Sequence, residues 1–121
     1  MDADTSAPLH QECRIVEAAG QLDLLTTPAF GLDLRAAGRE AAGYRWRLIV
    51  DLSRVSFMDA SPLHELCAAR NRHEARGGWL RVVYTHAGIA LLLRAAGLTG
   101  EFPRYASVHD ALHNQSSRTY E

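Results

Sequence analysis

The feature that most constrains the fold is an apolar run in the middle of the chain that leads into a helical pattern. Leu48, Ile49 and Val50 are consecutive apolar residues, which is typical of a strand that is covered on both faces of a sheet. Further along, apolar residues recur at helical spacing, as at Leu63 and Leu66. A buried strand followed by a helix is the repeating unit of a parallel sheet. This stretch therefore predicts an α/β domain.

The connection between this strand and this helix, residues 53–62, ends in a helix-start signal. Ser61 followed by Pro62 fits an N-cap and the first helical position, because the missing N–H of proline costs nothing there. In an alternative register, Asp59 is the cap and Ser61 lies in the first turn. Either register puts the Ser61 hydroxyl at a helix N-terminus, which favours negative charge. The fold would therefore tolerate a phosphate on Ser61, which would add a charge of roughly −1.5 to −2 beside Asp59.

Periodicity predicts further elements along the chain. Predicted strands cover residues 13–19, 48–52, 79–84 and 102–105, and the last is an edge strand because it contains proline. Predicted helices begin at Thr26 or Thr27, at Ser61, at His86 and at Ser107. Strands that alternate with helices imply parallel pairing through right-handed crossovers. We therefore expect a single α/β domain, with a mixed, mostly parallel sheet of about four to five strands and about four helices.

The expected organisation is one domain, residues 13–114, because 121 residues are too few for two. Residues 1–12 are expected to form a loose arm and residues 115–121 a flexible tail. Functional residues of parallel sheets collect at the carboxyl ends of strands. Asp59 and Ser61 follow the central strand, and Asp23 follows the strand before it. The two loops are therefore expected to lie side by side.

Composition excludes several classes of function. The net charge of −1 argues against capture of nucleic acid, and every basic residue is arginine. No apolar stretch approaches the roughly 20 residues that span a bilayer, and the acidic N-terminus is unlike a signal peptide, so we expect a cytoplasmic protein. Cys13 and Cys67 are far apart, so neither a disulfide nor a zinc site is indicated. His109 and His113 lack a third ligand nearby, and no metal or cofactor is expected.

Several side chains have an ordinary structural interpretation. Asp51 is expected at the end of the central strand, where its carboxylate satisfies loop N–H groups. Phe57 and Met58 are expected to pack beneath the loop, with partner contact as the alternative for Met58. Asp59, Ser61 and His64 cluster, but a hydrolytic triad needs a strained nucleophile elbow and an oxyanion hole, which D-A-S-P-L lacks. We therefore expect no enzyme.

The run IVDLSRVSFMDASPL, with GQLD at residues 20–23 upstream, resembles the STAS family, whose single-domain members are bacterial anti-sigma factor antagonists. The resemblance covers about residues 13–112 and implies that the expected α/β domain is STAS-like. It implies that Ser61 is the residue phosphorylated by an anti-sigma factor that is a kinase, and that Asp59 and Asp23 are the acidic residues near it. Two positions depart from the family pattern. Ala60 replaces a serine, and Pro62 replaces a glycine, which stiffens the backbone and removes a donor.

The resemblance implies a phosphoprotein that regulates transcription. Unphosphorylated, it would bind an anti-sigma factor, a serine kinase of the ATPase fold, and free a sigma factor; phosphorylated, it would let go. The expected partner-binding residues are Asp23, Met58, Asp59, Ala60, Ser61, Pro62 and His64. The alternative is a STAS scaffold subunit of a stress-sensing or lipid-transport complex without phosphorylation, which Pro62 favours. A reduced or missing first strand would leave a sheet edge available for a homodimer.

Overall fold

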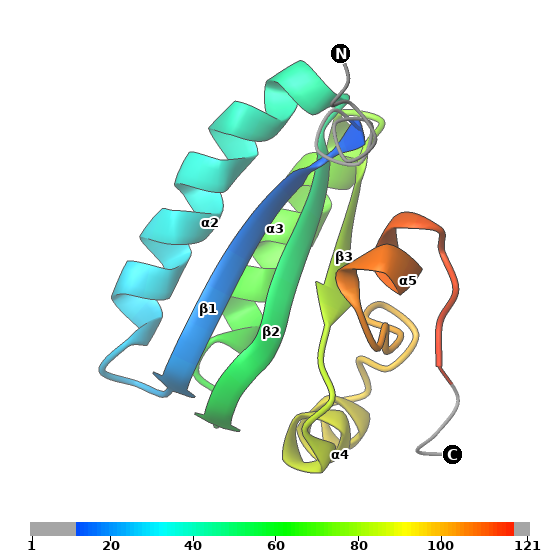
Figure 1. Cartoon of the computed structure of the whole chain (residues 1–121). Coiled ribbons are helices and arrows are strands. Elements are labelled where there is room, and N and C mark those ends of the chain that lie inside the picture. Colours follow the sequence, from blue (N-terminus) through cyan, green and yellow to red (C-terminus); the bar gives the residue numbers. More distant parts are fainter. Residues whose placement is uncertain (1–11, 118–121) are drawn as a thin grey trace.

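The computed structural model describes residues 12–117, which form a parallel α/β domain (Figure 1). The elements in chain order are β1 (Arg14–Leu22), α2 (Thr27–Ala41), the 3₁₀ turn η2 (Ala42–Tyr44), β2 (Arg47–Met58), α3 (Leu63–Ala75), β3 (Trp79–Val83), α4 (Ala87–Ala95) and α5 (Val108–Leu112). The strands form one sheet in the order β1-β2-β3, and both pairs are parallel. The predicted fold class is therefore confirmed.

The described residues contain three strands, fewer than the four to five expected. The predicted edge strand at residues 102–105 is reduced to a single parallel bridge between Tyr105 and Val83. Pro103 lies in this segment, and proline cannot donate to a ladder. The predicted N-terminal arm lies outside the described residues except for Glu12, and the predicted tail is described only as far as Ser117.

The core lies on both faces of β2. On one face, Leu48, Val50 and Leu52 pack against α2 and α3, and all three are almost fully buried. On the other face, Ile49 packs in a smaller cluster with Ala111 of α5. This two-sided burial explains why the central strand begins as an unbroken apolar run. None of the helices within residues 12–117 combines the length and the apolar character that crossing a bilayer requires.

β2 is longer than predicted, because it runs on to Met58 instead of ending near Leu52. β3 pairs with β2 only as far as Asp51, and beyond this point β2 pairs with β1 alone. Ser53, Arg54 and Ser56, whose polar side chains suggested a loop after the strand, are therefore exposed residues of β2. Asp51 lies inside the strand rather than at its end, and its Oδ1 accepts a hydrogen bond from the Ser53 N–H at 2.9 Å.

β1 also runs further than the predicted strand at residues 13–19, since it continues through Gly20 and Gln21 to Leu22. The register between β1 and β2 shifts on either side of Gly20, which has a φ of +78°. At each shift β2 contributes one more residue than β1, so the extra residues lie in β2, opposite β1. The pairing continues past both shifts as far as Leu22 and Met58. Among the described residues β1 lies at an edge of the sheet, and a homodimer through this edge stays a prediction.

The other predicted helices are present with small differences at their ends. α2 ends at Ala41, and the side chain of Thr26, a predicted cap, makes no capping bond to its first turn. His86 caps α4 through its Nδ1, which accepts from the Gly88 N–H. Ser107 caps α5 as predicted, since its hydroxyl accepts from the Asp110 N–H at 3.0 Å.

A tight turn connects η2 to β2 at the end of the sheet where the strands begin. Arg45 and Trp46 both have a left-handed backbone, with φ of 62° and 60°. The Trp46 carbonyl accepts two hydrogen bonds, from the Trp79 N–H at 3.1 Å and from Nδ1 of His73 at 2.8 Å. Because a carbonyl can only accept, Nδ1 of His73 carries the proton. These bonds hold an otherwise unfavourable turn in one conformation.

We predict that Gly78→Ala destabilises the domain. A Cβ at this position would lie 1.9 Å from the Trp46 carbonyl oxygen, which its two hydrogen bonds hold in place. Relieving such a clash costs about 1–3 kcal/mol, which urea denaturation measures. Gly43→Ala is the matched control, because a Cβ there would meet no atom within 4 Å. Equal stabilities of the two variants would contradict the packing described above.

We also predict that the stability depends on the protonation of His73, which is 1% exposed. Burial lowers the pKa of His73 below its ordinary 6.5; the hydrogen bond to Trp46 opposes this effect and the Arg72 charge adds to it. Below about pH 6.5 the unfolded chain therefore binds a proton that the folded chain does not, and the free energy of unfolding falls as the pH is lowered.

Urea denaturation of the wild type and of His73→Asn between pH 7.5 and pH 5.5 tests this effect. Asparagine keeps an N–H donor for the Trp46 carbonyl but does not titrate. The variant is therefore expected to lose less stability than the wild type as the pH falls. The other histidines contribute equally to both proteins, so identical slopes would rule out His73 as the titrating group.

Candidate functional site

The carboxyl ends of β1 and β2 bring two loops together, as the sequence predicts (Figure 1). Leu22 and Met58 are paired across the two strands, and each is the last residue of its strand. The pairing continues for one step, since the Asp59 N–H donates to the Leu22 carbonyl at 3.1 Å. The loop that starts at Asp23 therefore lies directly beside the loop that contains Ser61.

The loop from Asp59 to Pro62 is a turn held by its own side chain. Oδ1 of Asp59 accepts from the Ser61 N–H at 2.8 Å, and the Leu63 N–H donates to the Ala60 carbonyl at 3.1 Å. α3 begins only at Leu63 and has Pro62 at its N-cap position without a side-chain cap.

Both predicted capping registers are therefore wrong. The Ser61 side chain is not the cap of α3, Pro62 precedes the first helical residue, and Asp59 ties the turn in front of the helix rather than the helix itself. The physical reason is that Asp59 engages the Ser61 N–H within this turn, so the chain enters the helix after Pro62. Ser61 still lies next to the N-terminus of α3.

Exposure differs among the residues of this loop. Ala60 and His64 are exposed, and Asp59 and Ser61 are partly exposed, so another molecule can reach all four. Met58 is only 7% exposed and belongs to the core, and Pro62 is buried. These two residues support the loop from beneath and offer little contact area. A role of Ser61 and its neighbours in phosphorylation or partner binding stays a prediction.

Asp23 organises the neighbouring loop through hydrogen bonds to the backbone. Its Oδ1 accepts from the Leu25 N–H at 3.0 Å and from the Thr26 N–H at 3.1 Å, while its own N–H donates to the Thr26 hydroxyl. The tip of this loop carries Leu24 and Leu25, which are 74% and 88% exposed. The carboxylate of Asp23 thus fixes a turn that holds two leucines out in solvent.

A groove lies between the carboxyl end of β2 and α4. It has a volume of about 400 Å³ and is lined by Phe57, Met58, His86, Gly88, Ile89, Leu91 and Leu92. Phe57 is 50% exposed and Leu91 is 55% exposed. The interpretation of Phe57 as a core side chain is therefore wrong. Its position follows from the unpaired side of β2 beyond Asp51, where β3 no longer covers the strand.

The exposed leucines and Phe57 are the site features that the sequence did not reveal. The feature of the sequence that could have revealed them is the presence of large apolar residues, Leu24 and Leu25, in a turn. They matter because exposed apolar residues that gather on one edge mark interaction surfaces. Among residues 12–117, no group of three His, Cys, Asp or Glu side chains could hold a metal ion. The edge can therefore offer a hydroxyl, two carboxylates and apolar contacts to another molecule.

Comparison with known proteins relates this geometry to a family. A model of the STAS domain matches residues 4–111. The crystal structure of an anti-sigma factor antagonist from Mycobacterium paratuberculosis is similar, with a TM-score of 0.71 and 27% identity over 83% of this chain and 82% of that chain. A comparison with curated proteins finds no significant match.

Two further solved structures share the fold at lower identity. A putative anti-sigma factor antagonist from Thermotoga maritima has a TM-score of 0.72 and 17% identity, over 83% of this chain and 84% of that chain. The anti-sigma factor antagonist SpoIIAA in its unphosphorylated form has a TM-score of 0.65 and 17% identity, over 83% and 87%. Because the STAS model spans most of the sequence and the folds agree, the chain belongs to the STAS domain family.

Proposed function

We propose that this protein is an anti-sigma factor antagonist that phosphorylation of Ser61 switches off. The observation that carries the proposal is the position of Ser61, partly exposed in a turn at the carboxyl edge of the sheet and next to the start of α3. The similarity to the mycobacterial anti-sigma factor antagonist, at 27% identity, supports the choice of partner. In this proposal the partner is an anti-sigma factor of the ATPase fold, which also supplies the kinase.

The physical basis of the switch is charge added to a contact surface. Asp59 already occupies the Ser61 N–H, at 2.8 Å, so a phosphate on Ser61 would stand beside a carboxylate that stays in place. A partner that packs on this turn would then have to bury two like charges together. Because the turn precedes α3 and Ser61 does not cap it, the fold itself would lose little. Phosphorylation therefore ends binding without unfolding the domain.

Apolar side chains on both sides of Ser61 supply the contact area of the proposed interface. Leu24 and Leu25 lie at the tip of the Asp23 loop, and Phe57 and Leu91 border the groove. Apolar contacts of this kind dominate the binding energy of protein interfaces, while polar groups at the rim set specificity. We infer that the partner covers both loops at once and that the exposed residues Ala60 and His64 lie within the covered area.

The domain in this proposal has no catalysis of its own and acts in the cytoplasm by holding the anti-sigma factor, which leaves the sigma factor free. The lining of the groove supports the absence of chemistry there, since His86 is its one titratable side chain. A substrate site would instead bring several polar groups together in a pocket.

We predict that Ser61→Asp weakens binding to the anti-sigma factor, while Ser61→Ala binds constitutively. The stability of both variants is expected to stay within about 1 kcal/mol of the wild type, because the Ser61 side chain caps no helix. Isothermal titration with the anti-sigma factor kinase from the same genome measures the affinity. Ser53→Asp is the charge-matched control, since Ser53 is exposed inside β2. Unchanged affinity of Ser61→Asp would overturn the switch.

A second function is favoured by the buried Pro62, which stiffens the turn and offers no donor to a kinase. The domain would then be a scaffold subunit of a stress-sensing or lipid-transport complex, without phosphorylation. Mass spectrometry after incubation with the kinase and ATP separates the two functions. Phosphate on Ser61 supports the switch, and phosphate on Ser53 or Ser56 would show that the assigned residue is wrong. A chain without phosphate supports the scaffold.

We further predict that the double variant Phe57→Ser, Leu91→Ser weakens binding of the same anti-sigma factor by about tenfold or more, because each side chain would lose apolar contact area worth more than 1 kcal/mol. Both residues are at least half exposed, so the fold should be retained. Leu32→Ser is the control, since Leu32 lies on α2, is 65% exposed and does not line the groove. Equal affinities of the double variant and the control would show that the groove is not part of the interface.

A further inference from the structure

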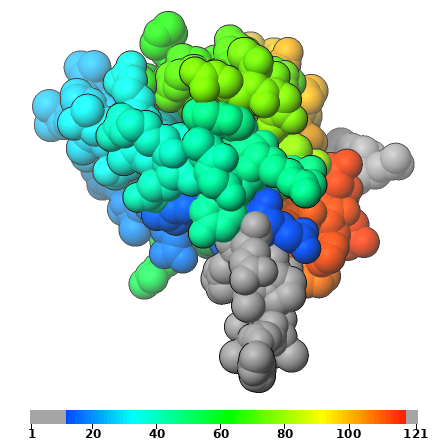
Figure 2. Space-filling view, turned by 90° about the horizontal axis from the view of Figure 1, so that it is seen from above, coloured from blue at the N-terminus to red at the C-terminus, as the bar shows by residue number. Residues whose placement is uncertain are grey.

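A second distinctive surface lies at the opposite end of the sheet, where the strands begin. Figure 2 looks onto this end, at the end of α2, the turn that follows it and the start of β1. Four arginines and two tryptophans from three segments lie at this end of the sheet, and we call them the Arg–Trp surface. Its members are Arg39, Arg45, Trp46, Arg47, Arg76 and Trp79. Arg39, Arg45 and Arg76 are exposed, and Arg47 is partly exposed.

Two of the four guanidinium groups of this surface lie beside tryptophan rings. The carbon Cζ of Arg76 lies 4.5 Å from the centre of the Trp46 ring. Cζ of Arg47 lies 6.0 Å from the centre of the Trp79 ring, and Arg81, outside this surface, approaches the same ring to 3.8 Å. The Trp46 backbone is itself fixed by the hydrogen bonds from His73 and Trp79. An arginine above an aromatic ring uses the face of its guanidinium and keeps the N–H edge for other partners.

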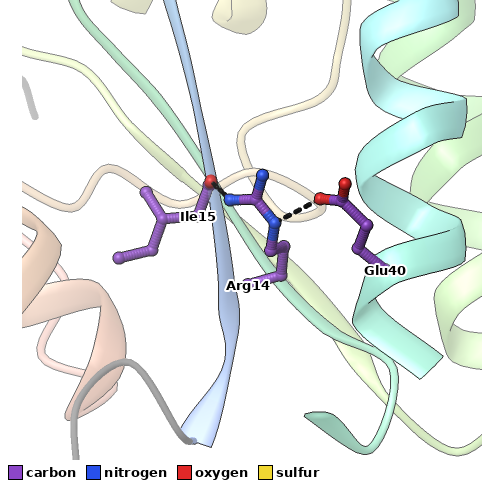
Figure 3. A network of polar contacts seen from close by, with 3 residues as sticks. All are labelled: Arg14, Ile15 and Glu40. Carbon is purple, nitrogen blue, oxygen red and sulfur yellow. Dashed lines mark hydrogen bonds and ion pairs between the residues drawn. The ribbon is translucent and has the colours of Figure 1, made fainter. Parts of the chain in front are cut away.

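Within residues 12–117, Glu40 and Glu74, which lie near this surface in the chain, are paired with arginines outside it. Glu40 is paired with Arg14, whose guanidinium also donates to the Ile15 carbonyl (Figure 3). Glu74 is paired with Arg70 at 3.0 Å. Within residues 12–117, no ion pair joins a carboxylate to any of the four arginines of the surface. Their charge and their N–H donors are therefore available to an anion from outside this part of the chain.

We propose that the Arg–Trp surface binds a short acidic segment of a partner protein, with carboxylates of Asp or Glu side chains seated against the guanidinium groups. Carboxylates match the planar fork of arginine and form paired charge-assisted hydrogen bonds with it. The surface lies at the far end of the sheet from Ser61. An acidic segment can therefore be held while the Ser61 edge contacts a different protein.

Two features favour a protein over other polyanions. A lipid surface would also need apolar side chains to insert, but the large exposed apolar residues among residues 12–117 are all elsewhere: Leu24, Leu25, Leu32, Phe57 and Leu91. A nucleic acid would need an attractive long-range field, whereas the net charge of the chain is −1. A short acidic segment needs only the local charge.

The test uses the full chain and a synthetic peptide of alternating Asp and Glu, with an Asn/Gln peptide of equal length as the neutral reference. Isothermal titration at low salt is expected to detect binding of the acidic peptide alone. The double variant Arg45→Gln, Arg76→Gln should weaken it by about tenfold or more, since two charge-assisted contacts are lost. In NMR spectra of the amides, the peptide should shift residues 39–47 and 76–79.

Arg54→Glu is the matched control, because it also lowers the net charge by two and Arg54 is exposed near the other end of β2. It should change the affinity less than twofold. If thermal unfolding shows that the first variant is unstable, Arg39→Gln, Arg45→Gln replaces it and leaves the stack of Arg76 on Trp46 intact. The proposal fails if Arg54→Glu weakens binding as much, if the shifts lie elsewhere, or if duplex DNA or anionic vesicles bind more tightly than the peptide.

Discussion

The parallel pairing of β2 with its neighbours is the constraint on which the rest of the structure depends. β2 is covered on both faces, with Leu48 and Val50 against α2 and α3 and Ile49 against the cluster that includes α5. Removing a buried side chain of this kind typically costs several kcal/mol, because the surrounding structure cannot close the cavity. β2 also leads directly into the Ser61 loop, and it positions the Asp23 loop through the pairing of Met58 with Leu22. The turn at Arg45 and Trp46 precedes its first residue. The positions of the loops at both ends of the sheet therefore depend on how β2 packs in its centre.

A parallel sheet with helical crossovers separates its two ends. All strands begin at one end and finish at the other, so the loops at the two ends contain different residues. At the carboxyl end, Asp23 and Asp59 each hold a turn through backbone hydrogen bonds, and apolar side chains stand out around Ser61. At the other end, arginines gather around Trp46 and Trp79. The two surfaces can therefore serve different partners without overlapping.

Local patterns predicted much of the candidate site. The order of strands and helices placed Asp23 beside the Asp59 and Ser61 turn, and the pairing of Leu22 with Met58 confirms it. The details of the turn were not predictable in this way, because the residue types at 59–63 are compatible with more than one helix start. Which register forms depends on the hydrogen bond from Ser61 to Asp59 and on the strand that precedes it.

The sequence by itself determined the fold class, the cap of α5 at Ser107 and the neighbouring positions of the two loops, because periodicity, capping and crossover handedness act over short stretches of chain. Tertiary structure alone decided the length of β2, the exposure of Phe57 and the gathering of arginines around Trp46. Each of these depends on how far β3 extends along β2 and on which distant segments meet at one end of the sheet. Such contacts join residues far apart in the chain, and no local pattern of residues encodes them.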